Sequence, residues 1–315
     1  MDPLPPSPIP FVALSLFLLF LLSSGLLVVG GTTFTFANKC GYTVWPGILS
    51  SSGSSELETT GFELAAGGSR SFQAPTGWSG RFWARTGCTF DGDGKGSCAT
   101  GDCGTGEVEC KGGGAAPPAT LAEFTLARPA SAKDFYDVSL VDGYNLPMVV
   151  ESRGGAGACA PAGCAADLNR RCPVELRIGE GEGEACRSAC GAFGKPEFCC
   201  SGAYASPATC RPSSYSQMFK SACPKSYSYA FDDPTSTFTC SGADYTITFC
   251  PESLPSQKSS TDSPTPKTGG GVLLEDNSWL ASLATGASPP TTARLSFIHQ
   301  SLVIVATMAC ILLSL

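Results

Sequence analysis

Cysteine is the residue type that most narrows the chemistry and the cellular compartment of this protein. The chain has 17 cysteines, and all but Cys310 fall between Cys40 and Cys250. Reducing compartments do not sustain disulfides at this density, so the composition predicts a protein that folds in an oxidising compartment. Cys199 and Cys200 are adjacent, and disulfide geometry does not suit adjacent residues, so we expect them to take different partners. Cys310 lies alone in a hydrophobic tail and drops out of the count if that tail is removed during maturation.

Histidine is nearly absent, which narrows the chemistry further. The single histidine, His299, lies in the same C-terminal tail. A mature chain without that tail lacks the base of Ser-His-Asp and Cys-His catalysis, so acid–base chemistry would fall mainly to carboxylates. The net charge of −7 argues against the basic surface that nucleic-acid binding needs. We expect no metal, no cofactor and no nucleic-acid partner.

The elements that position these residues are predicted to be short strands. The chain contains 37 glycines and 24 prolines, which indicates many turns. Alternating or β-rich runs predict strands at residues 33–37, 43–45, 71–74, 81–85, 122–126, 135–140, 148–151, 236–239 and 245–249. Helices are predicted at residues 184–193 and 213–221. Many short strands separated by turns favour an all-β sandwich or barrel.

Both ends of the chain carry apolar segments. Residues 11–22 form an apolar run of signal-peptide length, so residues 1–31 are interpreted as a signal peptide; the alternative is an uncleaved anchor over residues 11–30. Residues 301–315 are also apolar but short of the roughly 20 residues that span a bilayer. Small residues beginning at Gly286 precede a mostly polar spacer, which is the layout of a GPI-attachment signal. The alternatives are a short transmembrane tail or a vacuolar targeting segment.

Four segments therefore divide the chain. The predicted signal peptide precedes one cysteine-rich domain over residues 32–251. Residues 252–288 are rich in Ser, Thr, Pro and Gly and lack cysteine, which predicts a stalk, either O-glycosylated or a plain linker. Residues 289–315 are the segment expected to be removed on GPI attachment, or to remain as a membrane tail.

One motif identifies a family. Residues 94–110 read GKGSCATGDCGTGEVEC, which resembles the thaumatin-like signature G-x-G-x-C-x-T-G-D-C-x-x-G-x-x-x-C at every fixed position. Further similarity covers nearly all of residues 32–251, including YDVSLVDGYNLPM at 136–148 and EFCCSG at 197–202. The resemblance implies an all-β fold, a flattened sandwich of about eleven strands. It also implies a small disulfide loop at residues 86–116, a helical disulfide lobe at 166–223, and an acidic cleft between sandwich and lobe.

The resemblance also implies eight disulfides, because all sixteen cysteine positions of the family are present. The implied pairs are Cys40–Cys250, Cys88–Cys98, Cys103–Cys110, Cys159–Cys240, Cys164–Cys223, Cys172–Cys186, Cys190–Cys199 and Cys200–Cys210.

Five residues carry over from antifungal members of the family as the lining of the cleft. They are Arg81, Glu123, Asp137, Asp142 and Asp232, and because Asp233 follows, the last assignment can shift by one position. Clustered carboxylates repel one another and can push the pKa of one of them upward, which would leave an acid beside an ionised partner. On that basis Glu123 is the expected proton donor and Asp142 the expected base or nucleophile. The alternatives are glycan binding without catalysis and a purely structural role for the ion pairs.

Aromatic residues near the acids in sequence are candidate platforms for sugar rings, or else core residues. They are Phe90, Phe124, Tyr136, Tyr144 and Phe231.

The leading hypothesis is a secreted monomer, held at the outer leaflet by a lipid anchor or resident in the cell wall. It would bind β-1,3-glucan-like polysaccharide in plant defence or wall development. One alternative is a weak endo-β-1,3-glucanase. Another is an interaction protein that inhibits microbial hydrolases or contributes to signalling.

Overall fold

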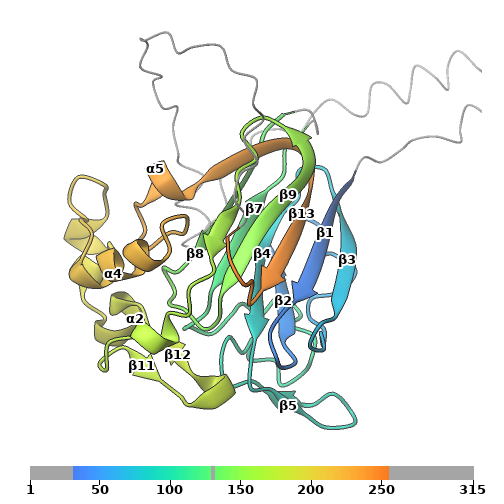
Figure 1. The fold of residues 1–315 in the computed structure, drawn as a ribbon, viewed down its shortest axis with the longest axis horizontal. Helices are drawn as coiled ribbons and strands as arrows, with labels where there is room; N and C mark the ends of the chain where they lie inside the picture. The colour runs from blue at the N-terminus through green and yellow to red at the C-terminus, as the bar shows by residue number, and fades with distance from the viewer. Residues whose placement is uncertain (1–30, 129–131, 255–315) are drawn as a thin grey trace, which may run out of the picture. The chain divides into compact units, whose positions relative to one another are not determined.

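The computed structural model describes residues 31–128 and 132–254, which fold around one large sheet (Figure 1). The strands are β1 (Gly31–Asn38), β2 (Trp45–Ser50), β3 (Ser69–Pro75), β4 (Ser79–Arg85), β5 (Thr89–Phe90), β6 (Gly96–Ser97), β7 (Leu121–Thr125), β8 (Asp134–Ser139), β9 (Met148–Ala156), β10 (Ala162–Cys164), β11 (Arg177–Ile178), β12 (Ala185–Cys186) and β13 (Phe238–Phe249). The helices are η1 (Asn169–Arg171), η2 (Gly181–Gly183), α2 (Ala189–Phe193), α3 (Pro196–Cys199), η3 (Gly202–Tyr204), α4 (Ser214–Ala222) and α5 (Asp233–Ser236).

Strand β13 joins two layers of the sheet. Its first residues pair with β8, which continues through β7 and β4 to β2. The rest of β13 pairs with β9 on one side and, in parallel, with β1 on the other, and β1 continues to β3. The sheet therefore curls into two layers, which confirms the expected β-sandwich class.

Aromatic side chains fill the space between the layers. Phe34 of β1 lies with its ring centroid 4.8 Å from both Phe82 of β4 and Phe124 of β7, in edge-to-face geometry. Tyr245 of β13 packs against Phe124 at 5.1 Å. Such pairs add about 0.5–1.5 kcal/mol each beyond the burial of apolar area. The alternation of residues along β1, β4 and β7 places these rings on the inner face and leaves the intervening residues on the outer face.

Eight disulfides connect the described residues, in the pairs that the resemblance implied. Cys40–Cys250 ties the segment after β1 to the residue after β13, across 210 residues of sequence. Closing so long a loop is worth about 5 kcal/mol in the chain-entropy model.

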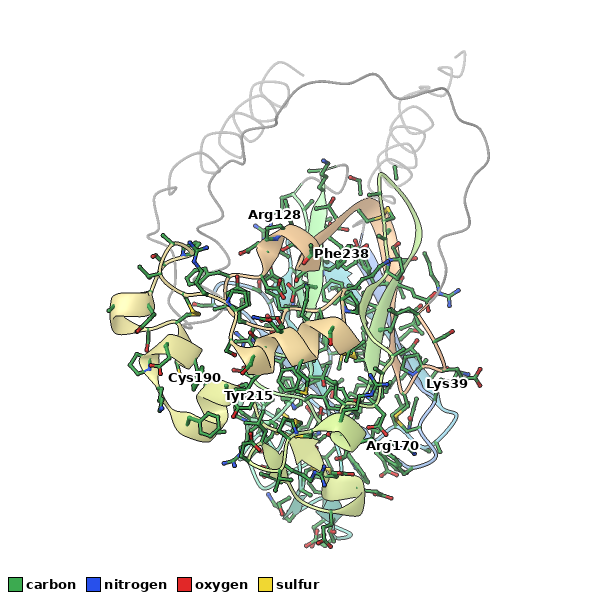
Figure 2. The ribbon with its side chains drawn as sticks, turned by 60° about the vertical axis from the view of Figure 1, so that its left-hand side comes forward. Lys39, Arg128, Arg170, Cys190, Tyr215 and Phe238 are labelled. Atoms are coloured by element: carbon green, nitrogen blue, oxygen red, sulfur yellow. A yellow bond between two sulfur atoms is a disulfide. The ribbon has the colours of Figure 1, made fainter. Side chains whose placement is uncertain are left out.

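Two disulfide-rich extensions flank the sheet. The small one carries β5 and β6 and packs Cys103 and Cys110 against Trp83 and Leu121 on the outer face. Gly47 of β2 lies under the Trp83 ring, where a Cβ atom would come within 2.3 Å of the indole. The larger one, the helical lobe, carries η1 to α4 and has its own core around Leu168. Figure 2 brings this lobe forward, with Cys190 and Tyr215 in it.

Two predicted elements differ from the structure in type, and the strand predicted at residues 43–45 lies mostly before β2, which starts at Trp45. Of the predicted helix at 184–193, only α2 is helical, because Ala185–Cys186 forms β12 against β11. The helix begins after Ser188, whose side chain accepts a hydrogen bond from the Gly191 amide and so caps the N-terminus. The predicted strand at 236–239 starts at Phe238, because Asp233–Ser236 forms α5 with a proline in its first turn.

Several expectations concern residues outside the described ranges. They are the signal peptide up to residue 30, the stalk from residue 255, the attachment site at Gly286 and the C-terminal tail. Strand β1 starts at Gly31, one residue before the expected start of the domain. No helix within residues 31–128 and 132–254 is long and apolar enough to cross a membrane.

Candidate functional site

Three of the five predicted cleft residues lie side by side on neighbouring strands. Arg81 of β4 is directly opposite Glu123 of β7, and Glu123 is directly opposite Asp137 of β8. Their sequence neighbours Phe82 and Phe124 belong to the aromatic core, so these three side chains lie on the outer face of the sheet. We call Arg81, Glu123 and Asp137 the charged row.

The charged row is only partly closed to solvent. The Arg81 and Glu123 side chains are 22% and 18% exposed, and Arg81 Nε lies 3.7 Å from Glu123 Oε1. That distance is longer than a hydrogen bond, so this contact is an ion pair. Asp137 is 2% exposed, and its buried Oδ2 accepts no hydrogen bond in the described structure.

Burial dominates the electrostatics of both acids in the row. Burial raises the pKa of Glu123; Arg81 opposes this shift and Asp142 adds to it. The pKa of Asp137 is raised well above its ordinary value, first by burial, then by Glu123 and Asp233, against the effect of Arg81. The row thus combines one cation with two carboxyls that both resist ionisation.

Asp142 lies near the row, in the turn that follows β8. The Gly143 amide donates to the Leu140 carbonyl and closes this turn, while the Asp142 carbonyl accepts from the Ala119 amide. Burial raises the pKa of Asp142, and Arg81 opposes that shift. Asp142 is therefore a fourth member of the electrostatic cluster around Arg81.

The structure separates the roles of Asp232 and Asp233. Asp232 Oδ2 accepts from the Ser228 amide at 3.0 Å and from its hydroxyl at 2.9 Å, and it forms an ion pair with Lys220 Nζ at 3.0 Å. Asp233 instead accepts from the Tyr227 hydroxyl at 3.1 Å and is the acid that acts on Asp137. Asp232 is thus held by Ser228 and by Lys220 of α4, whereas Asp233 belongs to the electrostatic surroundings of Asp137.

Tyr227 is a site residue that the sequence analysis missed. Its amide donates to the Val138 carbonyl, and it forms a parallel bridge with Ser139 at the end of β8. This pairing adds the segment after α4 to the edge of β8 and brings Tyr227 and Asp233 to the row. No sequence pattern predicts that Tyr227 pairs with β8, which lies almost ninety positions earlier in the chain.

Most of the candidate sugar platforms are core residues. Phe124, Tyr136 and Tyr144 have at most 1% of their surface exposed. Phe90 is partly exposed and stacks near Trp45 and the Arg85 guanidinium, within the small disulfide loop. The three buried rings therefore hold the sheet and the lobe together and do not present a face to a ligand.

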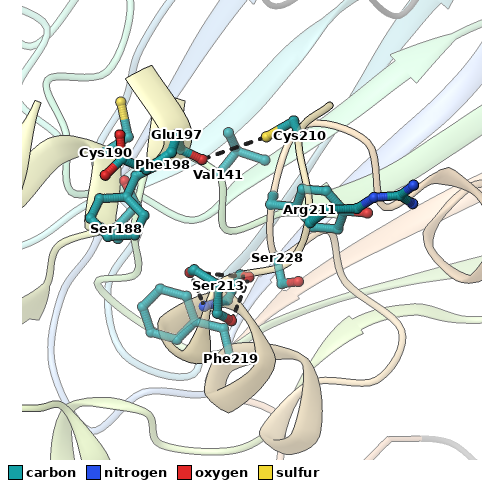
Figure 3. A pocket seen from close by; sticks show the side chains of 13 residues that line it. Val141, Ser188, Cys190, Glu197, Phe198, Cys210, Arg211, Ser213, Phe219 and Ser228 are labelled. Atoms are coloured by element: carbon teal, nitrogen blue, oxygen red, sulfur yellow. Dashed lines mark hydrogen bonds between the residues drawn. The ribbon is translucent and has the colours of Figure 1, made fainter. Parts of the chain in front are cut away.

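A separate pocket opens in the helical lobe (Figure 3). Its volume is about 380 Å³ including the space open to solvent, and its walls come from α2, α3, α4 and the segment around Ser228. Two of its hydroxyl groups already accept hydrogen bonds from backbone amides: Ser188 from Gly191 and Ser213 from Ser216. None of the five predicted cleft residues lines this pocket, although Val141 in its wall precedes Asp142.

No group of three or more His, Cys, Asp or Glu side chains arranged to hold a metal ion occurs among the described residues.

The fold and the row together define a class of protein: a disulfide-stapled β-sandwich with a helical lobe and an Arg–Glu–Asp row on one outer face. Residues 38–251 match the family model described as the thaumatin family, and the chain belongs to that family.

The chain is 67% identical over 244 residues to thaumatin-like protein 1 of Arabidopsis thaliana, covering 75% of this chain and 93% of that protein. It is 60% identical over 225 residues to pathogenesis-related thaumatin-like protein 3.5 of Cryptomeria japonica, covering 71% and 92%. It is 47% identical over 287 residues to an Arabidopsis thaliana PR5-like receptor kinase, covering 88% of this chain and 42% of the kinase.

Proposed function

We propose that this protein binds β-1,3-glucan-type polysaccharide outside the cell, through the charged row and Asp142, in defence against fungi or in wall biology. The observation that carries the proposal is the partly exposed pair of Arg81 and Glu123, which places a guanidinium and a carboxyl side by side at the outer face of the sheet. A guanidinium donates to sugar hydroxyls and a carboxylate accepts from them. The pathogenesis-related name of one relative supports the defence setting.

A binding experiment with a matched control tests this proposal. The full chain, produced through an oxidising secretory pathway, is mixed with insoluble β-1,3-glucan as the wild type, as Glu123→Gln and as Glu58→Gln. Glu58 also pairs with an arginine, Arg70, at 3.4 Å, but on an exposed part of the surface. We expect Glu123→Gln to weaken binding about tenfold, the effect of losing one charged hydrogen bond, and Glu58→Gln to leave it unchanged. Equal binding by all three proteins would remove the charged row from the proposal.

Weak endo-β-1,3-glucanase activity is the second candidate. The specific observation in its favour is that the pKa values of Glu123 and Asp142 are both raised by burial, since glycoside hydrolysis requires one carboxyl that keeps its proton. In this mechanism Glu123 protonates the leaving oxygen and Asp142 acts as base or nucleophile. The test is reducing-sugar release from soluble β-1,3-glucan. Release by the wild type that is lost in Glu123→Gln and Asp142→Asn, with glucan binding still measurable, supports the enzyme; no release by the wild type rejects it.

We propose further that the mature protein is held at the outer leaflet by a GPI anchor attached near Gly286. The short apolar end of the sequence supports this, and the relative named as a receptor kinase supports a cell-surface setting. Phosphatidylinositol-specific phospholipase C is expected to release the protein from membranes. Retention in the membrane fraction, with a known GPI-anchored protein released in the same sample, would contradict the anchor.

A further inference from the structure

Asp137 differs from Asp134, the other buried acid of β8, because one of its carboxyl oxygens has no hydrogen-bond partner. Asp134, three residues earlier on β8, accepts from the Ala127 amide at 2.9 Å and from the Tyr245 hydroxyl at 2.8 Å. Asp137 Oδ2 is buried to the same degree and accepts nothing. An ionised carboxylate that is buried without a hydrogen-bond donor is strongly disfavoured, whereas a protonated carboxyl is a neutral group.

The groups that face Asp137 come from each element packed around it. Glu123 lies opposite on β7, with Arg81 beyond it on β4. Asp233 faces it from α5, and the Tyr227 hydroxyl, bonded to Asp233, faces it from the segment after α4. Strand β13 pairs with β8 through Phe238 and Thr239 and adds no titratable group there. Arg81 is thus the one cation in this set, and it is already paired with Glu123.

We propose that Asp137 holds a proton at neutral pH, shared with Glu123, so that the charged row carries one negative charge balanced by Arg81 and selects an uncharged glycan. This inference rests on the proposed glucan-binding function. Asp137 is a positioning residue: it stands directly opposite Glu123 in the β7–β8 pair, and its buried Oδ2 is closed to solvent and so to a ligand. The carboxyl proton bridges toward Glu123 and keeps that carboxylate in place beside Arg81.

The direction of the pKa shift agrees with this geometry. Burial and the two neighbouring acids all raise the pKa of Asp137, and only Arg81 opposes them. Two carboxyls held side by side cannot both ionise without mutual repulsion, so one of them keeps its proton.

Glycan binding and this proton are then linked. A bound glycan covers Arg81 and Glu123 and excludes water, which makes a second, unbalanced negative charge at Asp137 more costly. An uncharged glycan brings no cation to offset that charge. Ionisation of Asp137 therefore weakens binding, and by reciprocity bound glycan raises the pKa of Asp137.

The test measures binding of an uncharged β-1,3-glucan hexasaccharide to the full chain by calorimetry between pH 5 and 9. Three proteins are compared: wild type, Asp137→Asn, which resembles the protonated carboxyl in shape and charge, and Asp93→Asn, which removes an exposed acid of the small disulfide loop. We expect the wild-type affinity to fall about fivefold or more as pH rises, the lower end of typical coupling between two binding events. The affinity of Asp137→Asn stays nearly constant, so that at pH 9 it exceeds the wild type, and Asp93→Asn follows the wild type.

A parallel NMR titration reads the proton directly. The side-chain carboxyl ¹³C resonance of Asp137 is assigned as the one that is absent from Asp137→Asn. It is then followed as a function of pH in the wild type without glycan, so the measured midpoint comes from the unmodified site. A midpoint well above the ordinary aspartate range supports the proposal, and an ordinary midpoint overturns it. A wild type and an Asp137→Asn with the same affinity profile overturn the link to the glycan. Absence of glucan binding at every pH rejects the proposed function, and the NMR midpoint then decides the protonation alone.

Discussion

Strand β4 carries two arginines on the same face of the sheet, and their surroundings are opposite. Arg85 is fully buried; its Nε donates to the Trp45 carbonyl at 3.0 Å and its Nη2 to the Val108 carbonyl at 2.6 Å. Burial lowers the pKa of Arg85 to about 10, although Asp102 and Glu109 oppose that shift. Arg81, four residues earlier, is partly exposed and meets one carboxylate at 3.7 Å.

The comparison separates a structural charge from one available to a ligand. Carbonyl groups from two chain segments satisfy Arg85, which fastens the small disulfide loop to β2. Around Arg81 the carboxyls outnumber the cations, and the buried Oδ2 of Asp137 accepts no hydrogen bond. Arg85 therefore contributes to stability from inside the protein, whereas Arg81 and Glu123 reach the surface, where a ligand can contact them.

The largest effect on stability is expected from replacing Arg85, the buried arginine of this comparison. Arg85→Met leaves the Trp45 and Val108 carbonyls buried without a donor, so the free energy of unfolding should fall by about 3 kcal/mol or more. Guanidinium chloride midpoints of the oxidised protein measure the loss.

The matched control for that substitution is Arg70→Met. Arg70 is 44% exposed in its pair with Glu58 and lies over the Phe62 and Phe72 rings. An exposed ion pair contributes at most about 1 kcal/mol, so the midpoint should shift much less. Equal shifts for the two variants would contradict the distinction between the two arginines.

A smaller effect, of opposite sign, is expected at Asp137. Its pKa is higher in the folded than in the unfolded protein, so the folded state binds more protons and stability falls as pH rises from the unfolded pKa to the folded one. Asp137→Asn removes this cost and should raise the melting temperature at neutral pH. The gain should shrink as the pH falls below 4, where the carboxyl becomes protonated in both states. A gain that does not change with pH would point to altered packing instead.

The smallest effect is expected from the exposed charges of the small disulfide loop. Glu107 contacts Lys95 and Lys111, and hydrogen bonds from these two lysines lower its pKa to about 2. The stabilisation is present above the unfolded pKa and disappears as pH falls toward 2. We expect Glu107→Gln to lower the melting temperature slightly at pH 7 and low salt, and the difference to vanish in high salt because the charges are exposed. A salt-independent loss would mean that Glu107 is structural.

Local sequence patterns predicted much of the fold. The alternation at residues 33–37 marks β1, and the resemblance supplied the cysteine pairs. The local pattern was wrong at residues 184–188, where a strand pairing and the Ser188 cap take the place of the predicted helix. These are tertiary effects: β12 exists because β11 is beside it.

The sequence supplied candidate residues for the site but not how they are arranged in space. The resemblance named Arg81, Glu123 and Asp137, but only the register of β4, β7 and β8 shows that they stand in one row. The sequence also does not indicate that Lys220 and Ser228 bind Asp232 while Tyr227 binds Asp233. The buried Oδ2 of Asp137 lacks a hydrogen-bond partner because of how the sheet packs, and no pattern of residue types indicates this.

The most direct test of the central claim is calorimetric titration of an uncharged β-1,3-glucan hexasaccharide into the full chain at pH 6. Wild type is compared with Arg81→Gln and with Arg70→Gln, which breaks an arginine–glutamate pair elsewhere on the surface. The charged row predicts that Arg81→Gln weakens binding by about tenfold or more, while Arg70→Gln binds as the wild type does. Equal affinities of the wild type and Arg81→Gln for the hexasaccharide would show that the glycan binds elsewhere.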